Sequence, residues 1–186
     1  MNLPASVEGR ERLRLFCALR LPDAVLDALC EWQARELRDG RVVPRSNLHV
    51  TLAFLGQRPA AELPEIAGAL QESAAGAEPI RLRPEKYRET RSVGMLVLRD
   101  LAGTASALAD DLFGRLERLG FYQRKQRAWL PHVTVLRFPR PPRLKPTLPD
   151  LGEIVPSDAA AYLSRLGRGG AEYFVVESFV LGERVR

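Results

Sequence analysis

The two histidines of the chain carry the clearest chemical signal in the sequence. Among 186 residues only His49 and His132 are histidines, and each is followed by Val and then by Thr. Threonine is scarce, with five in the chain, so Val-Thr after the second histidine has a chance probability of roughly 0.002 for this composition. The repeated motif therefore needs an explanation other than coincidence.

The residues around each histidine alternate as in a β-strand. Near the first motif, apolar Leu48, Val50 and Leu52 alternate with His49 and Thr51. Successive side chains of a strand point to opposite faces, so each histidine shares a face with its threonine while the valines enter a core. Two such strands facing one cleft would present two imidazoles and two hydroxyls. These groups can hold a phosphate between two proton carriers.

Periodicity and turn residues predict the elements that must position these motifs. Strands are expected at 13–20, around His49, at 79–83, at 93–99, from His132 to Phe138, at 159–166 and at 173–181. Helices are expected at 23–38, 60–75 and 102–119. Residues 1–12 are expected to form a loose tail, the proline-rich stretch 139–156 a surface loop or flap, and 167–170 a glycine turn.

The predicted elements repeat. Strand 13–20, helix 23–38 and the His49 strand have the same order as strand 93–99, helix 102–119 and the His132 strand. The two histidine motifs thus occupy equivalent places in two structural halves. Residues 13–186 are therefore expected to form one pseudo-symmetric α+β domain, in which two similar lobes bring both motifs to a shared cleft.

Composition sets the broad class. A hydrophobic share of 46% and a charged share of 27% are ordinary for a globular chain, and a net charge of +5 suits an anionic partner such as RNA. Cys17 and Cys30 form neither a CxxC pair nor a disulfide framework, which favours buried thiols in a reducing cytoplasm. No apolar run approaches the roughly 20 residues of a membrane span, and the N-terminus lacks the apolar core of a signal peptide. No membrane partner is expected.

Four stretches give the sequence a family resemblance. It resembles the two-histidine (2H) phosphoesterases, and among them the RNA 2′,3′-cyclic phosphodiesterase or 2′-5′ RNA ligase family. The similar stretches are 15–19, 43–56, 131–137 and 162–173, and Val135 replaces the more usual Leu of the second motif. The paired His-x-Thr signature is specific when both copies occur at this spacing. The resemblance implies a bilobal α+β fold with pseudo-two-fold symmetry, in which two antiparallel sheets flank a central cleft and helices lie outside.

The resemblance also implies a reaction. It implies metal-independent hydrolysis of an RNA or nucleotide 2′,3′-cyclic phosphate to a 2′-phosphomonoester. No cofactor is expected, and a monomer is expected. His49 would donate a proton and His132 would accept one, an order that the residues alone leave open. Thr51 and Thr134 would bind the non-bridging phosphate oxygens, and Arg137 would add charge-assisted hydrogen bonds.

Other functions remain open at this point. A 2′-5′ RNA ligase would use essentially the reverse reaction in the same cleft, and relatives act on other cyclic phosphates, such as those of ADP-ribose. A nucleotide-binding module that has lost catalysis is a different class, although it would not need both proton carriers. A purely structural role for the histidines is disfavoured, because two copies of the motif in equivalent halves use every histidine of the chain. A zinc pair is disfavoured because neither histidine has a further ligand at the usual spacing.

Several other residues have both a functional and a structural interpretation. Arg124, Lys125 and Arg127 could guide RNA phosphates, but a solvated loop is favoured. Trp129 and Tyr87 could stack on a base, but aromatic side chains more often belong to the core. The glycines of 167–170 could form a phosphate nest, but a plain turn is the simpler interpretation.

Overall fold

The computed structural model describes residues 11–124, 126–167 and 170–183. A loose tail is expected at 1–12, and residues 1–10 of it lie outside the described ranges. The first strand begins at Arg12, the last residue of the expected tail. In chain order, the elements in the described ranges are β1 (Arg12–Leu19), α1 (Asp23–Glu36), β2 (Arg41–Val42), η1 (Arg45–Asn47), β3 (Val50–Pro59), η2 (Ala60–Glu62), α2 (Leu63–Ala75), β4 (Leu82–Glu89), β5 (Val93–Asp100), α3 (Thr104–Arg118), β6 (His132–Arg137), β7 (Asp158–Gly167) and β8 (Gly170–Val180).

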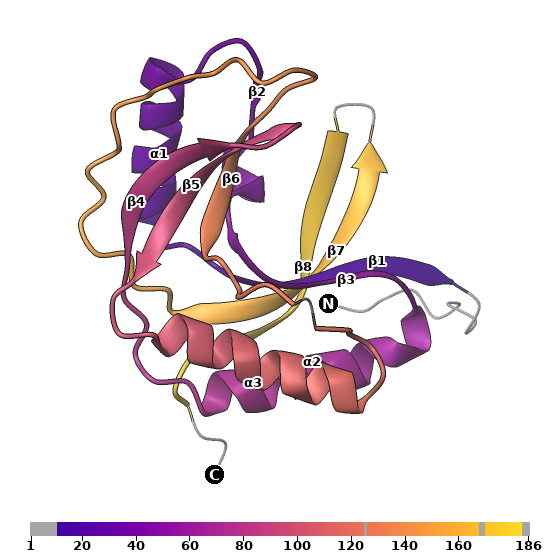
Figure 1. The fold of residues 1–186 in the computed structure, drawn as a ribbon. Helices are drawn as coiled ribbons and strands as arrows, with labels where there is room; N and C mark the ends of the chain where they lie inside the picture. Colours follow the sequence, from indigo (N-terminus) through magenta and orange to yellow (C-terminus); the bar gives the residue numbers. More distant parts are fainter. Residues whose placement is uncertain (1–10, 125, 168–169, 184–186) are drawn as a thin grey trace.

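The strands form one curled antiparallel sheet with two walls (Figure 1). The strand order is β4-β5-β6-β3-β1-β7-β8, and β2 pairs with β6. The two walls meet where β3 pairs with β6 through a single residue pair, Val50 with Val133. The α+β class and the two facing lobes are confirmed. The two sheets expected from the sequence are the two walls of this sheet, which turns sharply at the valine pair.

Helices α1 and α3 each pack on strands of the other half of the chain. α1 follows β1 in sequence but lies behind the β4-β5-β6 wall, whereas α2 and α3 lie together beneath the other wall (Figure 1). On α1, Trp32 meets the ring of Tyr87 in β4 with centroids 6.5 Å apart. The Gln33 amide donates to the carbonyls of Val43, 3.1 Å away, and of Val135 in β6, 2.8 Å away. Each half therefore supplies the helix that covers the other half's strands.

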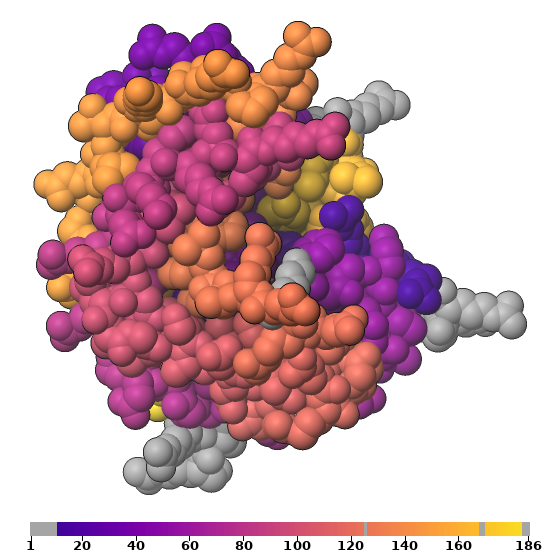
Figure 2. Space-filling model, in the orientation of Figure 1, coloured from indigo at the N-terminus to yellow at the C-terminus, as the bar shows by residue number. Residues whose placement is uncertain are grey.

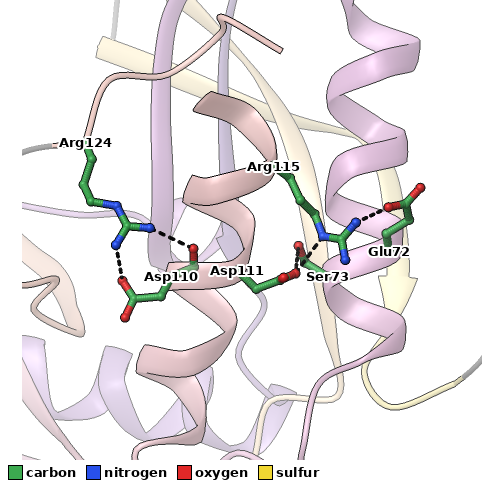
Figure 3. A network of polar contacts seen from close by, with 6 residues as sticks. All are labelled: Glu72, Ser73, Asp110, Asp111, Arg115 and Arg124. Carbon is green, nitrogen blue, oxygen red and sulfur yellow. Dashed lines mark hydrogen bonds and ion pairs between the residues drawn. The ribbon is translucent and has the colours of Figure 1, made fainter. Parts of the chain in front are cut away.

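A polar cluster joins α2 to α3 (Figure 3). Arg115 bridges Glu72 of α2 and Asp111 of its own helix, and Ser73 donates its hydroxyl to Asp111 at 2.7 Å. Burial alone would raise the pKa of Asp111, but the hydrogen bonds from Arg115 and Ser73 outweigh burial and lower this pKa. The cluster thus fixes the helix pair that supports the β1-β3-β7-β8 wall.

The proline-rich stretch is a loop that is hydrogen-bonded to β4 and to α1, on the outside of the β4-β5-β6 wall. Both carboxylate oxygens of Glu89 accept backbone N–H groups, from Arg143 and Leu144, each at 2.8 Å. Thr147 is bound twice, since its carbonyl accepts from Trp32 Nε1 at 2.6 Å and its N–H donates to Glu36 at 3.1 Å. The expected surface loop is confirmed, and these contacts fix it as a strap on this wall.

Two strands differ from the prediction for physical reasons. β4 begins at Leu82 and runs to Glu89, so it shares only two residues with the predicted strand 79–83. It is an edge strand, and its proline and charged residues obscure the pattern. β2 has two residues and is too short to show alternation. Among the described residues, no helix has both the length and the apolarity needed to cross a membrane.

Candidate active site

A cleft of about 530 Å³ lies between the two walls. In Figure 2 the surface is hollowed here, between the magenta strands β4 and β5 and the yellow hairpin of β7 and β8. The structure brings all five residues predicted from the sequence to this cleft, where they line it together: His49, Thr51, His132, Thr134 and Arg137.

The valine pair at the sheet junction explains this convergence. Val50 and Val133 are fully buried, so the residues on either side of each valine point to the opposite face, which is the cleft. His49 and Thr51 flank Val50, and His132 and Thr134 flank Val133, so both motifs present a histidine and a threonine to the cleft at this junction. The repeated motif thus becomes a two-fold arrangement of two imidazoles and two hydroxyls.

Each imidazole is anchored in the same way. His49 Nδ1 lies 2.9 Å from the carbonyl oxygen of Asn47, and His132 Nδ1 lies 2.8 Å from that of Leu130. A carbonyl oxygen only accepts hydrogen bonds, so we infer that Nδ1 carries the proton in both rings. Nε2 is therefore the nitrogen that gains or loses a proton toward the cleft. His49 Nε2 lies 3.0 Å from the hydroxyl oxygen of Thr51.

The surroundings of the two histidines differ. His49 lies among three aromatic rings, with centroid distances of 4.9 Å to Phe16, 5.5 Å to Tyr173 and 5.8 Å to Tyr162. Burial lowers the pKa of His49 to about 4, against the opposing effect of its hydrogen bond to Asn47, and the charges of His132 and Arg137 lower it further. In the free protein His49 is therefore neutral at pH 7.

This pKa leads to a testable pH dependence. In an NMR titration of the free protein, the His49 ring is expected to change protonation near pH 4. The unfolded chain binds a proton at this residue at a higher pH, near the ordinary value of 6.5, so the free energy of unfolding should fall as pH is lowered through this interval. A His49→Gln variant should lose that part of the slope. Titration of the wild-type ring at or above 6.5 would contradict this account.

Arginines give the cleft its charge. Arg14, Arg41 and Arg137 line it, and no Asp or Glu is found among its lining residues in the described part of the chain. Arg41 of β2 pairs directly across from Arg137 of β6. The cleft is therefore suited to an anionic ligand.

Two positioning residues were not recognised from the sequence. The Asn47 side chain donates to the Ala171 carbonyl at 2.7 Å and so holds the backbone that anchors His49. Trp129, three residues before His132, donates its Nε1–H to the Thr51 carbonyl at 3.0 Å and ties one motif to the other. Neither contact could be foreseen, because each depends on how distant segments are paired. The aromatic rings around His49 were not predicted either, because they come from distant strands.

The structure bears on only some of the other candidates, and of the glycine stretch 167–170 it places Gly170 in the cleft lining. Trp129 and Tyr87 pack within the fold and do not line the cleft, and Arg124 forms ion pairs with Asp110 and Glu117 (Figure 3 shows the first). Arg127 is exposed and lies outside the cleft lining. Lys125 and the glycine turn at 168–169 fall outside the described residues. Within the described ranges, no group of three or more His, Cys, Asp or Glu side chains could hold a metal ion.

Comparison with known proteins identifies the family. A family model described as the 2′-5′ RNA ligase superfamily matches residues 21–166. The chain belongs to the 2′-5′ RNA ligase superfamily. The resemblance noted in the sequence is thereby confirmed.

Relatives within this superfamily are similar over most of their length. A Thermus thermophilus protein named RNA 2′,3′-cyclic phosphodiesterase is 32% identical over 94% of this chain and 93% of its own length. An Escherichia coli protein of the same name is 32% identical over 68% of this chain and 73% of its own length. The crystal structure of TT0787 from Thermus thermophilus has a TM-score of 0.78 and 33% identity, covering 91% of this chain and 98% of that one. The expectation of an enzyme of this superfamily is confirmed.

Proposed function

We propose that the chain hydrolyses 2′,3′-cyclic phosphate ends of RNA or nucleotides to 2′-phosphomonoesters, without a metal ion or cofactor. One observation carries the proposal. Two imidazoles, each anchored through Nδ1 to a backbone carbonyl, direct Nε2 from the two motifs into one arginine-lined cleft. Such a pair supplies one proton acceptor and one proton donor, which hydrolysis of a phosphodiester requires. The names of the relatives support the same substrate.

In the proposed reaction, His132 Nε2 takes a proton from a water molecule, whose oxygen forms a bond to phosphorus. The bond from phosphorus to the 3′ oxygen breaks, and His49 Nε2–H gives its proton to that oxygen. This order of roles follows the family resemblance. His49 must then be protonated when substrate is bound. Burial and, to a smaller extent, His132 and Arg137 lower its pKa in the free protein, whereas the negative charge of a bound phosphate would raise it, so proton uptake should accompany binding.

The remaining cleft residues hold the phosphate. The hydroxyls of Thr51 and Thr134 donate to its two non-bridging oxygens, and Arg137 supplies charge-assisted hydrogen bonds. These donors are fixed by the sheet before substrate arrives, and pre-positioned donors stabilise charge that develops in the transition state. Both motifs come from one chain, so one copy supplies both imidazoles, and we propose that the enzyme acts as a monomer. Its two cysteines are free thiols, in agreement with a cytoplasmic location.

A direct assay tests the proposal. Nucleoside 2′,3′-cyclic phosphates are incubated with the protein and the product is identified by phosphorus NMR. The expected product is the 2′-monophosphate, at a rate that EDTA leaves unchanged and that has a bell-shaped pH dependence. A 3′-monophosphate, a metal requirement or a monotonic pH profile would contradict the two-imidazole reaction.

The same assay separates the alternatives. Adding RNA with a 5′-hydroxyl end tests for joined product, which a ligase would form. ADP-ribose cyclic phosphate tests for the related small-molecule reaction. Binding of nucleotide without turnover of any of these would identify a silent binding module.

A further inference from the structure

An exposed aromatic ring lies in the cleft together with an arginine. Phe54 is 49% exposed, and the Arg14 guanidinium lies over its ring, 5.0 Å from the centroid. Both residues line the cleft. Among the described residues, Arg14 forms no ion pair with a carboxylate. The pair therefore presents a π surface and a positive charge to the same ligand space.

A bulge in the sheet turns Phe54 toward the cleft. Ala18 pairs with Thr51 and Cys17 pairs with Ala53, so Leu52 is an extra residue in β3. Without it, Thr51 and Ala53 would share the cleft face. With it, Phe54 takes that place and lies across from Phe16. Bulges of this kind commonly redirect a side chain beside an active site.

The pair is displaced from the histidines along β1. The cleft-facing side of that strand carries Arg14, Phe16 and Ala18. Of these three, Phe16 contacts the His49 ring. Arg14 lies two residues farther out, roughly 7 Å along the strand. In Figure 1, β1 and β3 run side by side from the centre of the molecule toward its edge. A ligand that continues past the reacting phosphate along these strands meets the Arg14–Phe54 pair.

We propose that Arg14 and Phe54 form a subsite for the nucleotide that precedes the cyclic phosphate end in an RNA strand. Its base stacks on the pair, and its phosphodiester accepts hydrogen bonds from Arg14. Aromatic rings and guanidinium planes are the common stacking partners of unpaired RNA bases. The inference rests on the proposed function, and it specifies RNA ends rather than free nucleotides as the preferred substrate.

The test compares two substrates. One is cytidine 2′,3′-cyclic phosphate, and the other is a tetranucleotide with the same cyclic end. Phe54→Ala is expected to lower kcat/KM on the tetranucleotide about tenfold more than on the mononucleotide. Arg14→Gln is likewise expected to lower kcat/KM more on the tetranucleotide than on the mononucleotide. It should also reduce the salt slope of tetranucleotide binding by about 0.7, which corresponds to one phosphate contact to a single strand.

The chain offers a matched control. Arg165 lies over the Phe174 ring at 5.6 Å, and Phe174 is 45% exposed, but neither residue lines the cleft. Arg165→Gln and Phe174→Ala should leave both rates unchanged. Thermal unfolding of all four variants shows whether any loss arises from folding.

Two outcomes would overturn the subsite. Equal losses on both substrates would place the terminal base itself on Phe54, and no loss on either would remove the subsite altogether. If the wild-type protein turns over neither substrate, the proposed function fails. The subsite is then judged by fluorescence anisotropy, because Phe54→Ala should still weaken binding of a tetranucleotide that ends in a 2′-phosphate.

Discussion

Replacing His132 by alanine is expected to lower kcat on a 2′,3′-cyclic phosphate by about 10²–10⁴-fold, the usual contribution of one well-placed acid or base. The ring is partly exposed and its only hydrogen bond in the described structure is the one from Nδ1 to Leu130. Its removal should therefore leave the fold largely intact. The measurement is steady-state kinetics on cytidine 2′,3′-cyclic phosphate, together with thermal unfolding.

His49→Ala should cause a loss of the same size. His49 lies within an aromatic cluster, so truncation also leaves a cavity, and His49→Gln serves as the variant that fills the space without the imidazole. Near-wild-type turnover by a folded His49 or His132 variant would show that this residue carries no proton in the reaction. If His49→Ala does not fold, the role of the imidazole is judged from the turnover of His49→Gln instead.

Thr51→Val and Thr134→Val are each expected to lower kcat by about 10²-fold. Valine has nearly the shape of threonine but lacks the hydroxyl, so the variant tests one donor to the phosphate at little risk to packing. Removing one donor that stabilises the transition state typically has an effect of this size. Steady-state kinetics should show a larger change in kcat than in KM if the donors act mainly on the transition state.

Thr147→Val is the matched control for these variants. Thr147 is exposed on the strap, and it contributes its backbone rather than its side chain to the contacts there. Its substitution should leave kcat unchanged. If Thr51→Val and Thr134→Val also left kcat unchanged, the hydroxyls would be structural features of the strands and not phosphate ligands.

Much of the site could be predicted because its signal is local. The alternation around His49 and His132 places each histidine and its threonine on one face, and the repeated order of elements places both faces at one cleft. Arg137 follows from its position five residues after His132. These inferences need only strand geometry and the resemblance of short motifs.

The rest depends on pairing between distant segments. That Phe54 faces the cleft follows from a bulge against β1, and no pattern within β3 alone indicates the extra residue. The aromatic surroundings of His49 combine Phe16 of β1, Tyr162 of β7 and Tyr173 of β8, whose register the sequence does not define. The family resemblance likewise implies two sheets, and the repeat predicts two lobes without showing that one valine pair joins them.

The packing of α1 and α3 on strands of the opposite half has a consequence for how the protein folds. Gln33 and Trp32 of the first half rest on strands of the second, and α3 of the second half supports β3 of the first. The halves are thus interlocked, and neither has a complete hydrophobic interior without the other. We therefore expect unfolding to be cooperative across residues 13–186, so that the cleft forms either with both imidazoles in place or not at all.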